Sequence, residues 1–178
     1  AFEWSNDFKL IENAAIHDGL TSLLNHNAFL SRLDQEIDRC SRFQTNLGLI
    51  MLDLDKFKKI NDTYGHLYGD FILKEVGKII KENVRTIDVV GRFGGEEFSV
   101  ILVNTNVRDC IPLAKRIVEG INRKTFIFDG IATNLTISAG MSGYPSMSKE
   151  SKELIKMADD AMYQTKKNGG NDVTIFQS

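Results

Sequence analysis

Apolar residues in this chain follow the two spacings that distinguish strands from helices. Continuous or alternating apolar runs predict strands at residues 47–54, 89–93, 98–103, 126–128 and 135–141. Apolar residues at helical spacing predict helices at residues 27–42, 72–80, 111–121 and 148–167. This alternation of helices, strands and hairpins predicts a mixed α+β fold.

Turn signals refine this pattern. Asn25 or Asn27 is predicted to cap the helix at residues 27–42. Asp129-Gly130 predicts a hairpin that joins the strands at residues 126–128 and 135–141.

Gly94 and Gly95 separate two predicted strands and indicate a tight hairpin, because both residues can adopt a positive φ. Glu96 and Glu97 follow at once and place two carboxylates at its tip. Glycines beside negative charge indicate a group that approaches the backbone closely, and a metal-bound phosphate is the natural candidate. A solvated acidic turn is the alternative interpretation.

Asp53 and Asp55 lie at the carboxyl end of the first apolar run, an edge where ligand sites form in helix-covered sheets. A carboxylate that interrupts a buried run is costly unless it is paired or bound to a metal. Pairing with Lys56 or Lys58 is one solution. The other is a Mg²⁺ ion shared with Glu96, because Mg²⁺ takes one or two carboxylates together with substrate phosphates.

The hairpin sequence Gly94-Gly95-Glu96-Glu97-Phe98, with Arg92 two places upstream, is one of four ordered motifs. The others are residues 18–25 (DGLTSLLN), 53–70, and 158–163 (ADDAMY) with Lys166. Together they resemble the GGDEF family of diguanylate cyclases in its Glu-containing form. The resemblance implies a central, mainly antiparallel sheet flanked by helices, as in nucleotide cyclases and polymerase palm domains.

The resemblance divides the chain into two parts. Residues 18–178 are expected to form the GGDEF catalytic domain, and 178 residues with 42% hydrophobic content suit one well-cored unit. Residues 1–17 are expected to be the end of a connecting helix. Because the chain starts with Ala1, we expect an upstream sensor or receiver domain in the full-length protein.

Charge and composition exclude several functions. A net charge of −2 gives the chain no excess of positive charge with which to bind a nucleic acid polymer or an anionic membrane. Cys40 and Cys110 lack metal-ligand spacing and are expected to be reduced thiols, which suits the cytoplasm. No apolar run approaches the roughly 20 residues of a membrane span, so any tether would lie upstream.

The family resemblance implies that two GTP molecules condense into cyclic di-GMP and two pyrophosphates. The ribose 3′-hydroxyl of one GTP attacks the α-phosphate of the other across a homodimer. Two Mg²⁺ or Mn²⁺ ions per GTP site are expected, with Asp53, the Leu54 carbonyl and Glu96 as ligands. Glu96 and Glu97 are the expected catalytic residues, with Glu96 as ligand and candidate proton acceptor.

The resemblance also implies a substrate site. Its expected residues are Phe57, Lys58, Asn61, His66, Asp70, Gly94, Gly95 and Lys166. Guanine presents N1–H and N2–H donors, which match the amide oxygen of Asn61 and the carboxylate of Asp70. A turn at Asn61 and a helix cap at Asp70 are the alternatives.

Lys166 matches the family lysine that holds the triphosphate. Gly170 stands where the family commonly has an arginine, so one phosphate contact is expected to be missing.

Arg85-Thr86-Ile87-Asp88 matches the RxxD inhibitory site of the family, where cyclic di-GMP binds and suppresses synthesis. Arginine can donate to guanine O6 and N7 while aspartate accepts from N1 and N2. Arg116, on the next helix, is expected to complete this site. A surface ion pair between Arg85 and Asp88, and simple exposure of Arg116, are the alternatives.

Two other functions remain open. A catalytically weak or inactive domain that binds cyclic di-GMP or GTP is favoured by Gly170 and opposed by the intact Asp53, Glu96 and Glu97. A cyclase that makes an adenine-containing dinucleotide is opposed by Asp70, because adenine leaves its acceptor unpaired.

Overall fold

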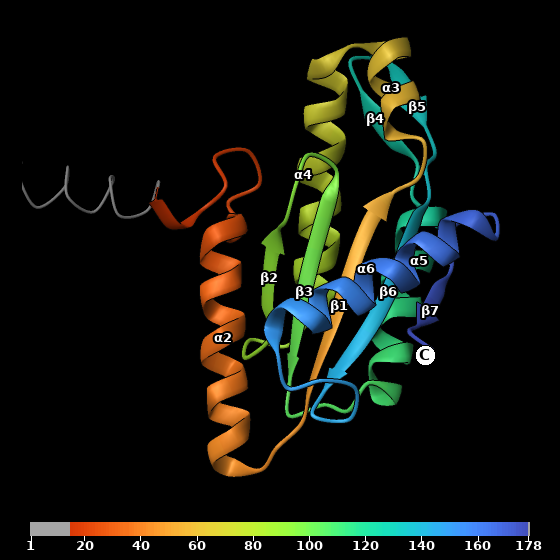
Figure 1. Cartoon of the computed structure of the whole chain (residues 1–178). Coiled ribbons are helices and arrows are strands. Elements are labelled where there is room, and N and C mark those ends of the chain that lie inside the picture. Colours follow the sequence, from red (N-terminus) through yellow and green to blue (C-terminus); the bar gives the residue numbers. More distant parts are fainter. Residues whose placement is uncertain (1–14, 178) are drawn as a thin grey trace, which may run out of the picture.

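A five-stranded sheet lies at the centre of the computed structural model, which describes residues 15–177 (Figure 1). In spatial order its strands are β2 (Val89–Arg92), β3 (Glu97–Val103), β1 (Leu47–Leu54), β6 (Ile137–Tyr144) and β7 (Val173–Ile175). Neighbouring strands are antiparallel except for the parallel pair β6 and β7. The predicted mainly antiparallel sheet is therefore confirmed. Most of the predicted connecting helix at residues 1–17 lies outside the described residues.

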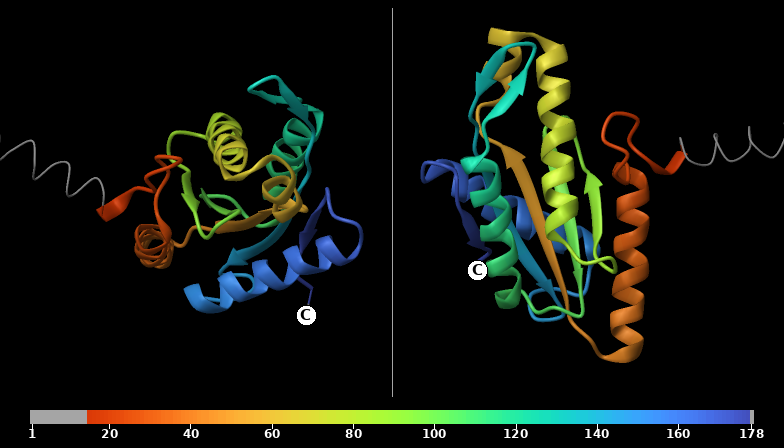
Figure 2. Two further views of the ribbon diagram at one scale, coloured as in Figure 1. Left: turned by 90° about the horizontal axis from the view of Figure 1, so that it is seen from above. Right: turned by 180° about the vertical axis from the view of Figure 1, so that it is seen from behind.

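Helices cover both faces of the sheet, as Figure 2 shows from above. The helices α4 (His66–Asn83) and α5 (Ile111–Arg123) pack on one face, and α2 (His26–Phe43) and α6 (Ser151–Lys167) pack on the other. Two short helices are α3 (Phe57–Tyr64) and the 3₁₀ turn η1 (Arg108–Cys110). Among residues 15–177, no helix combines the length and hydrophobicity needed to cross a membrane.

Strand β1 is buried on both faces, as its continuous apolar run predicts. Leu49 and Met51 pack toward α2 and α6, whereas Ile50 and Leu52 pack toward α4 and α5. Side chains alternate between the two faces of a strand, so Asp53 continues the row on the α6 side. This alternation directs the Asp53 carboxylate toward α6.

The helix predicted at residues 27–42 is α2, and the Asn25 side chain caps it by accepting from the Ala28 amide at 2.9 Å. The predicted partner of the strand at residues 126–128 was wrong. Asp129 and Gly130, both at positive φ, join β4 (Phe126–Phe128) to the short strand β5 (Ile131–Thr133). The later apolar run forms β6 in the central sheet, where β1 and α6 bury it fully.

Helix α3 was not predicted, because its sequence FKKINDTY has too few apolar residues to show a helical period. With α4 it forms a helical pair above the carboxyl end of β1, beside the β4–β5 hairpin (Figure 1).

Candidate functional site

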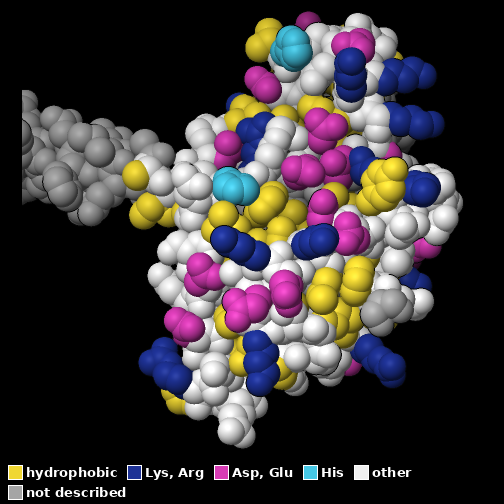
Figure 3. All heavy atoms as spheres, in the orientation of Figure 1, with side chains coloured by type: hydrophobic (Ala, Val, Ile, Leu, Met, Phe, Trp, Pro, Cys, Tyr) yellow, Lys and Arg dark blue, Asp and Glu magenta, His cyan; other side chains and the backbone are white. Residues whose placement is uncertain are grey.

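Acidic side chains gather where β1 ends and β3 begins (Figure 3). Asp53 is paired in register with Glu97 on one side and Ser138 on the other. Residues directly opposite each other on neighbouring strands share a face of the sheet. The tertiary structure therefore places the carboxylates of Asp53 and Glu97 side by side, and Glu96, the predicted metal ligand, is the residue before Glu97. Its role as a metal ligand stays a prediction.

The β2–β3 hairpin is confirmed, but Gly94 and Gly95 do not use the positive φ that was predicted for them. A Cβ on Gly94 would lie 2.6 Å from Oε2 of Glu97. Glycine at position 94 thus makes room for the Glu97 carboxylate. The close approach predicted for this turn involves a side chain of the hairpin itself.

Lys166, in the last turn of α6, reaches the predicted metal ligands on β1. Its Nζ donates to Oδ1 of Asp53 and, at 3.3 Å, to the Leu54 carbonyl oxygen. A lysine partner for Asp53 was anticipated, but Lys56 and Lys58 were the wrong candidates. Lys166 lies 113 positions away in the sequence, so local spacing could not identify it.

The site carries more negative charge than its lysine neutralises. Burial raises the pKa of the Asp53 carboxyl, although the hydrogen bond and charge of Lys166 act against this shift. Burial followed by the charge of Asp53 raises the pKa of Glu96 and of Glu97. The ionised forms of these groups are therefore destabilised, and a bound cation would relieve that penalty.

The donors at this site suit a hard divalent cation. Carboxylate and backbone carbonyl oxygens are the ligands that Mg²⁺ prefers, and substrate phosphates usually complete its coordination. Within the described part of the chain, no group of three or more His, Cys, Asp or Glu side chains forms a preassembled metal cluster. The chemistry of the oxygen donors fits an ion whose coordination substrate phosphates would complete.

Asp55 has a different environment from Asp53. Its carboxylate accepts from the hydroxyl groups of Thr136 at 2.6 Å and Ser138 at 2.7 Å, and from the Asn171 amide at 3.0 Å. These bonds hold the loop after α6 against the end of β1. The carboxylate of Asp55 therefore has a structural role.

Gly170 lies in this loop at φ +73°, and a Cβ there would approach Oδ2 of Asp55 to 2.8 Å. An arginine at position 170 would be strained in this backbone. The backbone conformation at position 170 therefore favours glycine, where the family commonly has an arginine.

Asn61 forms the centre of the predicted base site, on α3. Its Oδ1 is buried and, among the described residues, has no hydrogen-bond partner. Gly69 of α4 leaves the space that this oxygen occupies, because a Cβ there would collide with it. Phe57 is buried beneath Asn61 as part of the core. An unpartnered buried acceptor indicates a site where a ligand donor fits.

The other predicted substrate residues surround Asn61 with exposed polar groups. His66 and Asp70 lie in the first turns of α4, and Lys58 lies on α3. All three side chains are exposed. They remain predicted ligands of the nucleotide, and Phe57 supports the site from within the core.

Arg85 and Asp88 form an ion pair in the loop between α4 and β2. Arg85 donates to both carboxylate oxygens of Asp88 at 2.8 and 3.0 Å, and the Val103 amide donates to the same carboxylate at 3.2 Å. The Asp88 side chain is fully buried, whereas that of Arg85 is 52% exposed. Asp88 thus fastens the loop to β3, and its contact with a guanine base stays a prediction.

Arg116 lies beside the same loop. Its Nε donates to Oδ1 of Asn83, the last residue of α4, at 2.8 Å. The fold therefore brings the three predicted inhibitory residues to one end of the molecule, at the opposite end of β2 from the hairpin tip.

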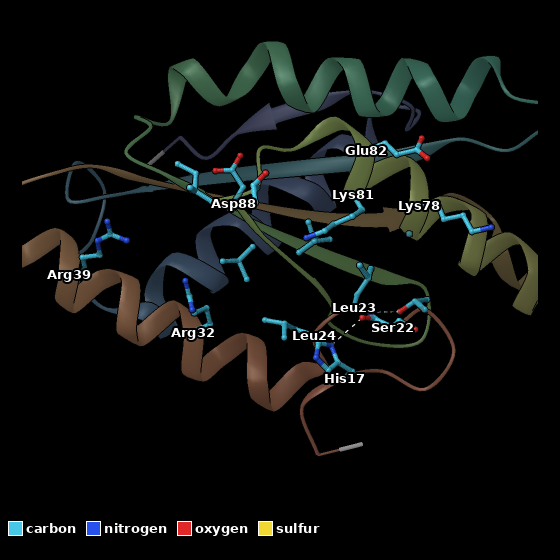
Figure 4. A pocket seen from close by; sticks show the side chains of 16 residues that line it. His17, Ser22, Leu23, Leu24, Arg32, Arg39, Lys78, Lys81, Glu82 and Asp88 are labelled. Atoms are coloured by element: carbon cyan, nitrogen blue, oxygen red, sulfur yellow. Dashed lines mark hydrogen bonds between the residues drawn. The ribbon is translucent and has the colours of Figure 1, made fainter. Parts of the chain in front are cut away.

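A groove of about 610 Å³ between α2 and α4 borders this loop. Arg32 and Arg39 point toward it from α2, and Lys81 points toward it from α4 (Figure 4). Apolar residues also line it: Leu23, Leu24, Ile87, Val89 and Val90. Asp88 is the one predicted site residue that contributes to this groove.

The predictions missed two contributors to the acidic site. Asp159 of α6 raises the pKa of Asp53 and Glu97 through its charge. Arg92 binds both Asp18 and the Gly95 carbonyl. Both residues were part of recognised motifs, but pairing between distant segments is not visible in local spacing.

These observations define a class: α+β domains with an acidic, lysine-containing site at the carboxyl end of the central strand and a polar pocket beside it. The family model described as "Diguanylate cyclase, GGDEF domain" matches residues 15–172. The chain therefore belongs to the GGDEF family.

Curated relatives agree with this assignment. Diguanylate cyclase A of Treponema denticola is 39% identical over 97% of this chain and 47% of its own length. Diguanylate cyclase DosC of Escherichia coli is 36% identical over 96% of this chain and 38% of its own length. The chain thus spans less than half the length of these two relatives.

Solved structures show the same fold. The GGDEF domain of DgcB from Caulobacter crescentus, in complex with c-di-GMP, has a TM-score of 0.86 and 30% identity, covering 92% of this chain and 94% of that chain. The active GGEEF domain of a diguanylate cyclase from Vibrio cholerae has a TM-score of 0.82 and 29% identity, covering 88% of this chain and 99% of that chain.

Proposed function

We propose that this domain is a diguanylate cyclase that condenses two GTP molecules into cyclic di-GMP and two pyrophosphates. The observation that carries the proposal is the convergence of Asp53, the Leu54 carbonyl, Glu96, Glu97 and Lys166 at the end of β1. Relatives named as diguanylate cyclases over nearly the whole chain support the same reaction.

Guanine recognition rests on Asn61 and Asp70. The buried Oδ1 of Asn61 can accept a hydrogen bond from the guanine edge. The Asp70 carboxylate can accept from the remaining donors of that edge. Adenine presents an acceptor at N1, so this pair of acceptors favours GTP over ATP.

Asp53, the Leu54 carbonyl and Glu96 would hold Mg²⁺ or Mn²⁺, two ions being expected per GTP. When bound, these ions offset the triphosphate charge and lower the pKa of the ribose 3′-hydroxyl. Lys166, whose ammonium group lies against the same oxygens, would bind the triphosphate.

The reaction forms a bond between the 3′-oxygen of one GTP and the α-phosphorus of the other, and pyrophosphate leaves. Glu96 or Glu97 would accept the 3′-hydroxyl proton, because these two carboxylates lie beside the predicted metal ligand Asp53. One domain holds one GTP, so two domains face each other as a homodimer, and a second attack closes the ring. Product binding at Arg85, Asp88 and Arg116 would inhibit the enzyme. In the full-length protein an upstream sensor or receiver domain would control this dimer.

A domain that binds nucleotide without catalysis is the second candidate, favoured by Gly170. The strain expected for arginine at this position weakens that argument, because the loop backbone is itself suited to glycine.

The direct test incubates the purified chain at high concentration with GTP and Mg²⁺, or Mn²⁺, and separates the products by chromatography. We expect cyclic di-GMP and pyrophosphate, and at least a 100-fold loss of product for Glu96→Ala. Asp34→Asn, an exposed change on α2, is the control and should retain full activity. No product from the confirmed dimer with either metal would favour the nucleotide-binding candidate.

A further inference from the structure

The β4–β5 hairpin is a separate two-stranded sheet that lies beside the start of α4 (Figure 1). Tyr68, in the first turn of α4, is 1% exposed, and its hydroxyl donates to the Phe126 carbonyl oxygen at 3.0 Å. The same hydroxyl lies 2.8 Å from Oγ1 of Thr133, which is also buried. A tyrosine hydroxyl has one proton, so it accepts from Thr133 while it donates to Phe126. One side chain of α4 therefore joins both strands of the hairpin.

Aromatic rings extend this contact to α3. The centroid of the Tyr68 ring lies 6.1 Å from those of Phe71 and Phe128, and these two phenylalanines stack at 5.0 Å. Tyr64, the last residue of α3, lies 5.1 Å from Tyr68. Phe126 is fully buried in the core, so the hairpin is a fixed support. Tyr68 thus contacts both the hairpin and α3.

Tyr68 is also next to the proposed guanine ligands. Gly69, the following residue, packs so closely on Asn61 that a Cβ there would collide with Oδ1 of Asn61. Asp70 comes directly after Gly69 on α4. A shift of this part of α4 would therefore move Asp70 and change the space around Oδ1 of Asn61 at the same time.

The first turn of α4 begins without a side-chain cap. Gly65 precedes the helix at φ +88°, and no side-chain hydrogen bond caps it within the described part of the chain. His66, Leu67 and Asp70 are exposed. The two hydrogen bonds of Tyr68 reach segments 58 and 65 positions away in the sequence. They tie the start of α4 to a distant and rigid part of the fold.

We propose that Tyr68 and Thr133 form a positioning pair through which the β4–β5 hairpin holds the first turns of α4, and that the pair thereby sets the spacing of the acceptors on Asn61 and Asp70 that selects guanine. The pair touches no reacting atom and acts through Gly69 and Asp70. The proposal rests on the proposed function for its consequence in guanine selection, and on the hydrogen bonds alone for its effect on α4.

The first test compares amide hydrogen exchange in wild type and in Tyr68→Phe, which removes the hydroxyl and keeps the ring. We expect exchange at residues 69–72 to rise about fivefold, with no change in β1. Tyr144→Phe is the matched control. It makes the same change at a tyrosine that is 6% exposed and packs on the α2 and α6 side of the sheet.

The second test measures dissociation constants for GTP and ITP analogues that carry a methylene bridge between the α- and β-phosphates and so cannot release pyrophosphate. Inosine lacks the N2 amino group of guanine, so one proposed acceptor loses its donor. We expect Tyr68→Phe to weaken binding of the GTP analogue about tenfold and of the ITP analogue about twofold, because the spacing of two acceptors matters most for guanine. A general loss of stability would weaken both equally.

Thr133 supplies a second pair of variants, which applies even if Tyr68→Phe does not fold. Thr133→Ser keeps the hydroxyl and should bind both analogues as wild type does. Thr133→Val removes the hydroxyl and should narrow the preference for the GTP analogue, as Tyr68→Phe does.

Equal exchange at residues 69–72 in Tyr68→Phe and Tyr144→Phe would overturn the proposal. An unchanged ratio of the two affinities in both Tyr68→Phe and Thr133→Val would overturn it as well. A wild type that binds the two analogues equally would instead overturn the proposed recognition of guanine by Asn61 and Asp70. The exchange comparison would still decide whether the hairpin holds α4.

Discussion

Single residues at the end of β1 have different roles although they have the same chemistry. Asp53 faces α6, where Lys166 is its partner and Glu97 its neighbour. Asp55 is enclosed by the donors Thr136, Ser138 and Asn171. The hydrogen bonds to Asp55 hold the loop after α6 against β1, whereas Asp53, which other carboxylates crowd, would gain from a cation.

Glu97 should make the ligand-free fold less stable at neutral pH. Burial and then the charge of Asp53 raise its folded-state pKa above the unfolded value, so the folded state binds its proton more tightly. Below the unfolded-state pKa, Glu97 is protonated in both states and its ionisation does not affect stability. As pH rises through the folded-state pKa, ionisation of Glu97 lowers the free energy of unfolding. We expect Glu97→Gln to raise Tm by roughly 2 °C at pH 7 and to match wild type at acidic pH.

Calorimetry or fluorescence melting across pH 3 to 8 without divalent metal would measure this difference. The exposed Asp34→Asn serves as the control and should leave Tm unchanged. A Glu97→Gln protein that melts below wild type at pH 7 would contradict the assignment of the raised pKa.

At the scale of elements, the site depends on how strand ends and helix ends meet. The end of β1, the β2–β3 hairpin and the last turn of α6 each supply part of it. The loop after α6 is bound to β1 through Asp55, so the position of Lys166 depends on this junction. Gly170 is the residue that allows the loop to approach.

Replacing Gly170 tests this junction. Gly170 and Gly130 share nearly the same φ, +73° and +75°, but only at Gly170 would a Cβ meet a neighbouring group, the Asp55 carboxylate. We expect Gly130→Ala to lower the free energy of unfolding by about 1 kcal/mol through backbone strain. Gly170→Ala should lower it by about 2 kcal/mol, and Gly170→Arg by at least as much.

Urea denaturation of the three variants checks these values. Equal losses for the two alanine variants would mean that the loop moves away from Asp55 at little cost. In that case the missing arginine would matter more for phosphate binding than for folding.

At the scale of the whole molecule, the acidic site and the predicted inhibitory loop lie at opposite ends of β2. The acidic end carries one predicted substrate site per chain, and the proposed reaction needs two. Specific activity should therefore fall on dilution, because the dimer dissociates and each half-site is left with a single GTP.

A dilution series of initial rates, with cyclic di-GMP measured by chromatography, tests this dependence. We expect the rate to vary with the square of the enzyme concentration below the dimer dissociation constant. A tandem fusion of two copies is the control, and its specific activity should stay constant. Constant specific activity of the single chain far below that constant would exclude an obligatory dimer.

The sequence by itself determined most elements and the family. Continuous apolar runs predicted β1 and β3 because a strand buried on both faces needs such runs, and helical spacing predicted α2, α5 and α6. The same reasoning missed α3 and joined β4 to the wrong strand, because short polar helices and two-residue turns lack a strong period. The motifs also identified Asp53, Glu96 and Asn61 as candidate site residues.

Only the tertiary structure decided which side chains meet. Lys166 reaches Asp53 across 113 positions, and Arg92 reaches Asp18 across 74. It also separated the roles of Asp53 and Asp55, and it explained Gly94 and Gly170 by the carboxylates beside them. Local patterns record the burial of each residue along one element, whereas these contacts depend on where the packing of several elements places their ends.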